Sequence, residues 1–212
     1  MKALVISSSP RRNGNSFLMA ESALKGLQDA GHDAELVVLE DYLKHFLKDC
    51  RVCRKSDGEC GLEDDYRSLF LEKFLPADGV IFSTPLYWYG MSAQLKAFFD
   101  RSFCYYAASY PNSDKVVEQY MGKRYGLLVA SEETFPSAPA GIIHGIQEFS
   151  RYSRSEFVGH VHGIGNKRGD VTSDSTDSIK QSYDLGKTLF TRHFSDYHLD
   201  TDRAGSVWDN VK

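Results

Sequence analysis

The sequence predicts an α/β fold in which a doubly wound, five-stranded parallel sheet carries helices on both faces. Apolar, strand-like runs recur along the chain and alternate with stretches that have the apolar periodicity of helices. The first and third of these runs are apolar almost throughout, as strands covered on both faces of a parallel sheet are. We expect the five strands to lie in the order 2-1-3-4-5.

The expected elements alternate regularly along the chain. Strands are expected at residues 3–7, 34–39, 79–84, 125–130 and 156–163. Helices are expected at residues 15–30, 64–74, 91–104, 140–153 and 175–194. Two connections are long: the crossover at residues 40–78, which carries three cysteines and includes the helix expected at 64–74, and the tyrosine-containing connection at residues 105–123. Loops of that length in a compact domain usually serve a function or an interface.

Length and composition are those of a soluble globular protein. The 212 residues suit one domain, expected at residues 1–195, followed by a polar tail at residues 196–212. The tail contains Trp208, which favours docking on a neighbouring subunit. A net charge of -4 argues against nucleic acid as a partner. No apolar run approaches the roughly 20 residues of a membrane helix, so we expect a cytoplasmic protein without a membrane partner.

The turn after the first strand has the residue types of an anion site. It reads "SSSPRRNGNS" (residues 7–16) and precedes an expected helix, whose first N–H groups carry partial positive charge. Gly14 is expected to allow unusual backbone angles, and Asn15 and Ser16 stand where a helix is capped. Arg11 and Arg12 add positive charge. The same residue types also cap helices without a ligand, but the pattern favours a phosphate monoester, since it matches neither GxGxxG nor GxxxxGK[ST].

Aromatic residues follow the third strand at the same edge of the sheet. Pro85 ends the strand, and three consecutive aromatic residues follow in "PLYWYG" (residues 85–90). Such a loop is able to stack on a planar heterocycle and bind its edge through backbone groups, although aromatic residues also cluster at interfaces. A phosphate at the first turn and a flat ring at the third together describe flavin mononucleotide, FMN.

These motifs resemble those of the flavodoxin-like NAD(P)H-dependent FMN reductases, especially the branch that includes the iron-sulfur flavoproteins. The two specific motifs are "SSSPRRNGNS" and "STPLYWYGMSAQLKAFFDR", and the likeness extends to "GECGLEDDY", "MGKRYGLLVAS" and "VGHVHGIGNKRGDV". The resemblance implies a flavodoxin-like sheet. The sequence itself shows no hydrolase pattern and no acid-base centre, so we expect no catalytic side chain. The resemblance also implies a homodimer or homotetramer.

The resemblance also assigns the candidate cofactor-binding residues by motif position. The FMN phosphate is expected at Ser9, Arg11, Asn15 and Ser16, with help from Asn13. The isoalloxazine ring is expected along Pro85, Leu86, Tyr87 and Trp88. Ser131, at the end of the fourth strand, is expected near the ribityl chain or the pyrimidine edge.

Three cysteines lie close together in the connection after the second strand. Cys50, Cys53 and Cys60 form C-x2-C-x6-C, whereas iron-sulfur flavoproteins use four closely spaced cysteines. Cys104 falls in a distant helix, and no motif links it to the other three. Zinc would also lack a fourth ligand unless Asp49 or His45 supplied it. A Cys50/Cys53 redox pair remains an alternative, but the pattern favours inert thiols and no metal.

The sequence therefore predicts an FMN-dependent oxidoreductase. NAD(P)H is expected as co-substrate, passing a hydride to flavin N5, after which a small-molecule acceptor takes the electrons: a quinone, free flavin, nitro or azo compound, or metal ion. One alternative is an electron-transfer flavoprotein that does not use a nicotinamide, or an iron-sulfur flavoprotein variant. Another is a flavin-free binding or regulatory protein.

Overall fold

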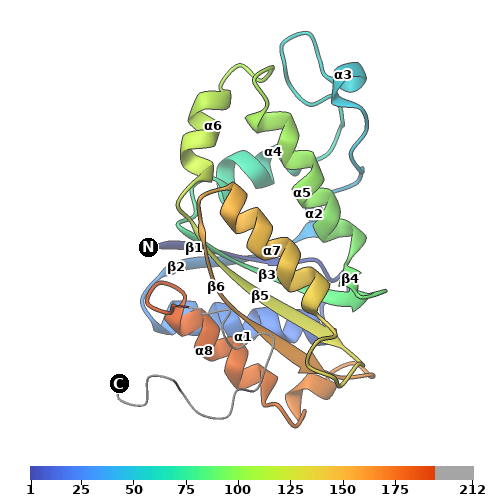
Figure 1. Cartoon of the computed structure of the whole chain (residues 1–212), viewed down its shortest axis with the longest axis vertical. Coiled ribbons are helices and arrows are strands. Elements are labelled where there is room, and N and C mark those ends of the chain that lie inside the picture. Colours follow the sequence, from blue (N-terminus) through green and yellow to red (C-terminus); the bar gives the residue numbers. More distant parts are fainter. Residues whose placement is uncertain (194–212) are drawn as a thin grey trace, which may run out of the picture.

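The computed structural model describes residues 1–193 and shows a sheet between two layers of helices (Figure 1). The five long strands are β1 (Lys2–Ser7), β2 (Asp33–Val38), β3 (Gly79–Tyr87), β5 (Arg124–Ser131) and β6 (Glu156–Ile164). They are parallel and lie in the order β2-β1-β3-β5-β6. The short strand β4 (Gly90–Met91) pairs antiparallel with the end of β3, outside this order. The predicted 2-1-3-4-5 order of the five long strands is thus confirmed.

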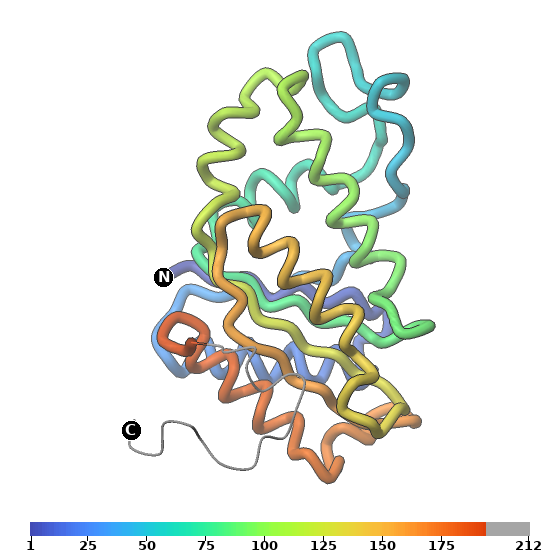
Figure 2. The backbone as a smooth tube through the Cα atoms, viewed as in Figure 1, coloured from blue at the N-terminus to red at the C-terminus, as the bar shows by residue number. Residues whose placement is uncertain are grey.

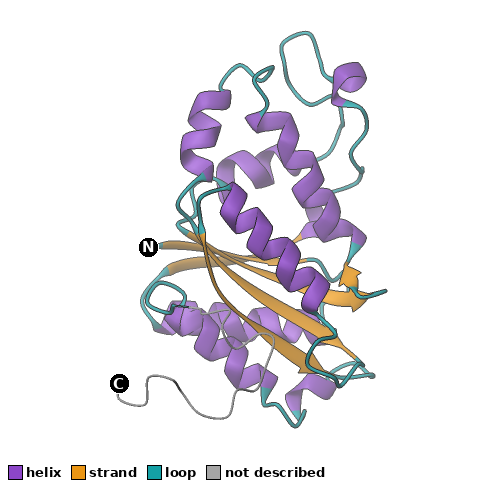
Figure 3. Cartoon of the chain, in the orientation of Figure 1, coloured by secondary structure: helices purple, strands orange, loops and turns teal. Residues whose placement is uncertain are grey.

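Helices cover both faces of the sheet (Figure 3). One layer consists of α1 (Asn15–Asp29) and α8 (Ser178–Thr188). The other layer contains α4 (Tyr66–Ser68), the π-helical turn η1 (Leu69–Phe74), α5 (Ala93–Tyr106), α6 (Ser113–Tyr120) and α7 (Ala140–Tyr152). The remaining short helices are α2 (Leu39–Tyr42), α3 (Cys50–Cys53) and η2 (Asp170–Thr172).

Alternation along the central strands explains the two cores. In β1, Val5 packs in the core under α1 and α8, whereas Leu4 and Ile6 pack in the core on the opposite face. All three are buried, and the burial of each such side chain stabilises the folded state by about 1.5–3 kcal/mol. α1 and α8 approach so closely that a Cβ atom at Gly186 would lie 2.1 Å from the carbonyl oxygen of Ala23.

The core beneath α5 is rich in aromatic rings. Phe70 stacks between Phe74 and Tyr105, with ring centroids 5.3 and 5.4 Å apart, and Phe98 meets Phe74 edge to face. The chain path in Figure 2 places η1 and α5 on the same side of the sheet, and residues of both lie in this core. The predicted helix at residues 64–74 is therefore present, but it begins as one α-helical turn and continues as a π-helix.

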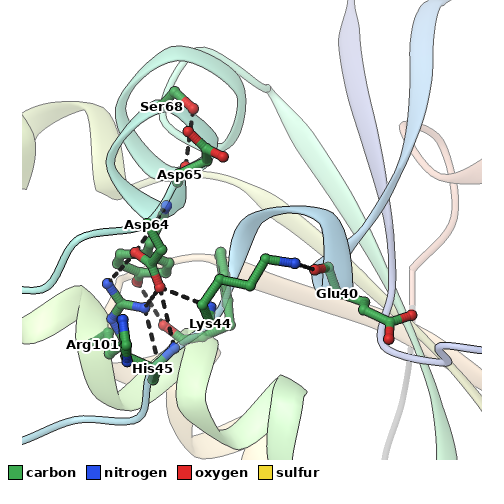
Figure 4. A network of polar contacts seen from close by, with 9 residues as sticks. Glu40, Lys44, His45, Asp64, Asp65, Ser68 and Arg101 are labelled. Atoms are coloured by element: carbon green, nitrogen blue, oxygen red, sulfur yellow. Dashed lines mark hydrogen bonds and ion pairs between the residues drawn. The ribbon is translucent and has the colours of Figure 1, made fainter.

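Residues 43–65, the crossover segment, extend from the helical layer at the top of Figure 1. A buried ion pair ties this segment to α5: Arg101 donates to both carboxylate oxygens of Asp64, at 2.5 and 2.7 Å (Figure 4). The side chains of Arg101 and Asp64 are 2% and 0% exposed. Asp64 also accepts the backbone N–H groups of Lys44 and His45.

The sequence prediction was wrong in one connection. Residues 105–123 were expected to form a loop, but α5 runs to Tyr106 and α6 occupies Ser113–Tyr120. Only Val116 and Tyr120 of α6 are buried, so the apolar pattern that would identify this helix is short. The predicted tail at residues 196–212, including Trp208, lies outside the described residues.

Candidate functional site

A cavity lies where four of the parallel strands end. It has a volume of about 290 Å³ and lies among the connections that follow β1, β3, β5 and β6. Its lining residues are Ser9, Arg11, Gly14, Asn15, Ser16, Pro85, Leu86, Tyr87, Ala130, Ser131, Glu132, Gly165 and Asn166. Every predicted site residue except Asn13 and Trp88 is among them. The carboxyl ends of parallel strands are where open α/β sheets bind ligands.

The first turn folds onto itself and begins α1 without a side-chain cap. The hydroxyl of Ser9 accepts the N–H of Arg11, and the N–H of Gly14 donates to the carbonyl of Arg11. Gly14 is the N-cap residue, and no side chain in the described part of the chain caps the first-turn N–H groups. Those N–H groups, together with the helix dipole, favour an anion at this end of the cavity.

Gly14 serves this turn through its size and not through its backbone angles. Its φ of -83° and ψ of 160° are ordinary, so the prediction of unusual angles was wrong. A Cβ atom at Gly14 would lie 3.2 Å from the carbonyl oxygen of Arg11 and 3.3 Å from the hydroxyl of Ser9. The absence of a side chain therefore keeps the turn close to the start of the helix.

The two arginines of the turn have different surroundings. Arg12 donates to both carboxylate oxygens of Asp41 at 2.7 Å and does not line the cavity. Arg11 lines the cavity and, within residues 1–193, has no ion-pair partner. Asn13 is exposed and lies outside the cavity lining. Arg11 is thus the cation of the turn that is available to a bound anion.

Asn15 joins the first turn to a loop that sequence reasoning did not include in the site. Its side-chain amide donates to the carbonyls of Gly165 and Lys167, and its side-chain oxygen accepts the N–H of Gly169. These bonds bring Gly165 and Asn166 to the cavity. The polar run "GIGNKRGD" after the fifth predicted strand is the signal that would have identified this loop.

The aromatic residues after β3 form a tight hairpin. Tyr87 pairs with Gly90 across a two-residue turn, and both turn residues, Trp88 and Tyr89, have positive φ, at 50° and 58°. Large side chains rarely adopt this conformation, which costs about 1–3 kcal/mol at each residue. Trp88 is 98% exposed at the tip, so the hairpin holds its ring away from the protein core.

A second cavity, of about 460 Å³, adjoins the first through Leu86, Tyr87, Ser131 and Glu132. Trp88, Tyr89 and Glu133 complete its lining. Tyr89 donates its hydroxyl to Glu133 at 3.2 Å, and this hydrogen bond raises the pKa of Tyr89. Trp88 thus lies at the second cavity and not at the first.

Ser131 is hydrogen-bonded to a histidine on the neighbouring strand. The hydroxyl of Ser131 lies 2.7 Å from Nε2 of His162. Burial lowers the pKa of His162 below its ordinary value, so its imidazole is neutral at pH 7. The sequence contains no motif that links these two residues, because they are on neighbouring strands.

The four cysteines are all free thiols. Within residues 1–193, no group of three or more His, Cys, Asp or Glu side chains is arranged to hold a metal ion. The prediction that Cys104 lies apart from the others was wrong, because its thiol and that of Cys60 are hydrogen-bond partners.

Within residues 1–193, no helix is long and apolar enough to span a membrane.

Comparisons with known proteins agree with this geometry. The family model described as NADPH-dependent FMN reductase matches residues 1–146. The chain is 31% identical over 176 residues to a Bacillus subtilis protein named as an NAD(P)H-dependent FMN-containing oxidoreductase, YwqN, covering 82% of this chain and 91% of that protein. It is 36% identical over 202 residues to an iron-sulfur flavoprotein of Archaeoglobus fulgidus, covering 94% of this chain and 84% of the relative. The structure of the Trp repressor binding protein from B. subtilis matches with a TM-score of 0.64 and 25% identity, covering 91% of this chain and 99% of that one.

Proposed function

Because the chain belongs to the NADPH-dependent FMN reductase family, we propose that it passes electrons from NAD(P)H, through FMN in the first cavity, to a small aromatic acceptor in the second. One observation carries this proposal: the uncapped start of α1 and the aromatic hairpin after β3 line the same cavity. The first suits a phosphate and the second suits a flat ring.

The phosphate end of the cavity fits FMN. Arg11, the first-turn N–H groups of α1 and the hydroxyl of Ser16 would hold the phosphate, because these groups provide positive charge and donors at one place. Asn15 acts by holding the loop at residues 165–169 against the turn, since its side chain is already hydrogen-bonded there. Gly14 leaves the space that the turn needs.

The other end of the cavity fits the ring. Backbone groups from Pro85 to Tyr87 would bind the ring edge, and Ser131, steadied by His162, would meet it from β5. When bound, FMN supplies the redox chemistry, because its ring takes two electrons from a nicotinamide and returns them to a second substrate. The chain therefore needs to bind, orient and shield the ring, and no acid or base of its own is required.

The second cavity supports a neutral or cationic aromatic acceptor. Its lining combines three aromatic residues with the carboxylates of Glu132 and Glu133, and no lysine or arginine of the described chain lines it. We expect about tenfold higher kcat/KM for a neutral quinone than for its sulfonated analogue, because the two carboxylates repel an anion. Glu132→Gln should reduce this preference and leave the Tyr89–Glu133 hydrogen bond intact.

An iron-sulfur variant of this function does not fit the described residues. An iron-sulfur cluster normally needs four thiolates, and the cysteines among the described residues are not arranged as a metal site.

A homodimer or homotetramer remains a proposal, supported by the exposed hairpin tip at Trp88. Light scattering of the purified protein, with Trp88→Ser as the comparison, tests it.

Anaerobic spectroscopy tests the proposed function. The purified protein is saturated with FMN, and the flavin absorbance is followed during titration with NADH and NADPH in separate experiments. The proposal expects loss of the oxidised flavin absorbance with at least one nicotinamide and its return when a quinone is added. If neither nicotinamide bleaches the bound flavin, the protein is an electron carrier and not a reductase. If FMN does not bind, the flavin site itself is wrong.

A further inference from the structure

Two thiols from separate segments meet beside a buried arginine, away from the residues that line the two cavities. Cys60 lies in the crossover segment and is partly exposed. Cys104 lies near the end of α5 and is 2% exposed. Their thiols are hydrogen-bond partners, and both are unbridged.

Several contacts of the neighbouring residues hold this pair together. One terminal nitrogen of Arg54 donates a hydrogen bond to the carbonyl of Gly58. The other donates to the carbonyl of Cys104, at 2.9 Å. Tyr110 donates its hydroxyl to Glu59, the residue before Cys60, at 3.2 Å. These hydrogen bonds hold residues 54–59 against the end of α5 and the residues that follow it, so the position of Cys60 does not depend on the thiol contact alone.

Arg101 places a buried cation beside this pair of thiols. It precedes Cys104 by one turn of α5, and Asp64 occupies its two terminal nitrogens. Its Nε is buried and bonds to no oxygen acceptor among residues 1–193, and its guanidinium interacts with the Cys60 thiol. A buried donor needs an acceptor, and a thiolate at Cys60 would supply one.

The electrostatics assign different roles to the two thiols. Hydrogen bonds from Cys104 and from the backbone of Leu62, together with Arg101, lower the pKa of Cys60 to about 5, although burial opposes this. The same interaction with Cys60, with burial, raises the pKa of Cys104. Cys60 is also the more exposed of the two, so it is the thiol that a reagent from solvent reaches first, with Cys104 buried behind it.

We propose that Cys60 and Cys104 form a peroxide-sensitive redox pair, in which Cys60 is the nucleophile and Cys104 is the resolving thiol. The Cys60 thiolate attacks hydrogen peroxide, the O–O bond breaks, and hydroxide leaves as Cys60 becomes a sulfenic acid. The Cys104 sulfur, having lost its proton to that hydroxide, then attacks Cys60 Sγ. A disulfide forms, the S–O bond breaks, and its oxygen leaves as water after taking up a proton from solvent. Each peroxide oxidises two thiols and is itself reduced to two waters.

The product would be a covalent bond between the crossover segment and α5. Arg54 already joins the carbonyls of Gly58 and Cys104, so the segment that carries Cys60 lies beside α5 before any bond forms. A thiol reductant reverses the bond by exchange. Cys50 is a matched comparison in the same segment, since burial raises the pKa of its thiol.

Thiol counting and peptide mapping test the proposal on the full chain. The reduced protein is treated with hydrogen peroxide, quenched, and its free thiols are counted after denaturation. The expected result is the loss of two thiols, one cross-linked peptide that contains Cys60 and Cys104, and full recovery with dithiothreitol. Cys104→Ser should yield a dimedone adduct at Cys60 without a cross-link, and Cys60→Ser should abolish the rapid thiol loss. A Cys50→Ser, Cys53→Ser double variant should behave as the wild type.

Three outcomes would overturn the proposal. All four thiols of the wild type could persist under peroxide, the cross-link could join Cys50 to Cys53, or Cys60→Ser could lose thiols as fast as the wild type. The wild-type map decides the matter even if Cys104→Ser fails to fold.

Discussion

Replacement of Arg11 tests the phosphate end of the proposed FMN site most directly. Arg11 lines the first cavity and lacks an ion-pair partner within residues 1–193, whereas Arg12 is bound to Asp41. A charge-assisted hydrogen bond contributes about 1.5–3 kcal/mol, which corresponds to about 10- to 150-fold in Kd. Because Arg11 is exposed and partly screened, we expect Arg11→Ala to weaken FMN binding about tenfold, at the lower end of that range.

The chain and the ligand each offer a control for this experiment. Arg12→Ala removes only a surface ion pair, so FMN affinity should change less than about twofold. Riboflavin lacks the phosphate, and its affinity should be the same for the wild type and for Arg11→Ala. The assay is quenching of flavin fluorescence at low and high salt. The reasoning fails if Arg11→Ala weakens riboflavin as much as FMN, or if both arginine variants weaken FMN equally.

Four further predictions concern stability, the turn, the thiol and the hairpin. Asp64→Ala leaves its arginine buried and unpaired and should lower the free energy of unfolding by about 3–5 kcal/mol in urea titrations, whereas Asp65→Ala should change it little. Burial raises the pKa of Asp64, but its hydrogen bonds hold it below the ordinary value, so its contribution should be full above about pH 4 and be lost as pH falls further. Gly14→Ala should weaken FMN binding in the fluorescence assay by displacing the first turn, with unchanged secondary structure in circular dichroism. Mass spectrometry should find Cys60 alkylated by iodoacetamide about tenfold faster at pH 6 than an unperturbed thiol, because its larger thiolate fraction outweighs its lower nucleophilicity. Trp88→Gly should raise the melting temperature by a few degrees, because it removes a large side chain from a left-handed backbone position, and an unchanged or lower value would contradict the strain argument.

The strands and their order could be predicted from the sequence because their signal is local. β1 and β3 are buried on both faces, so their side chains are apolar almost throughout, and the order follows from the general pattern of doubly wound sheets. Helix α6 was missed because it buries only Val116 and Tyr120. The surrounding residues are polar, which resembles a loop as closely as it resembles a surface helix.

Most of the residues expected at the site line the first cavity, because residues at the ends of consecutive strands meet at one edge of the sheet. The remainder depends on contacts between residues far apart in the sequence. Asn15 bonds to Gly165 and Lys167, and Cys60 meets Cys104, and no spacing rule connects either set. A capping pattern described Asn15 as a helix-start residue, but it could not identify the loop that its side chain holds.

The hairpin after β3 is where the chain departs most clearly from local preference. A two-residue turn of this kind favours Asn and Gly, yet Trp88 and Tyr89 occupy it with positive φ. Tyr89 offsets part of the strain through its hydrogen bond to Glu133 and its ring contact with Phe135. Trp88, at 98% exposure, gains almost nothing from burial within its own chain. Strain that folding does not offset persists where a bound ligand or a second subunit uses the side chain, and the second cavity adjoins this indole. The hairpin therefore supports the proposed binding site through its backbone geometry, as the first turn does through its charge.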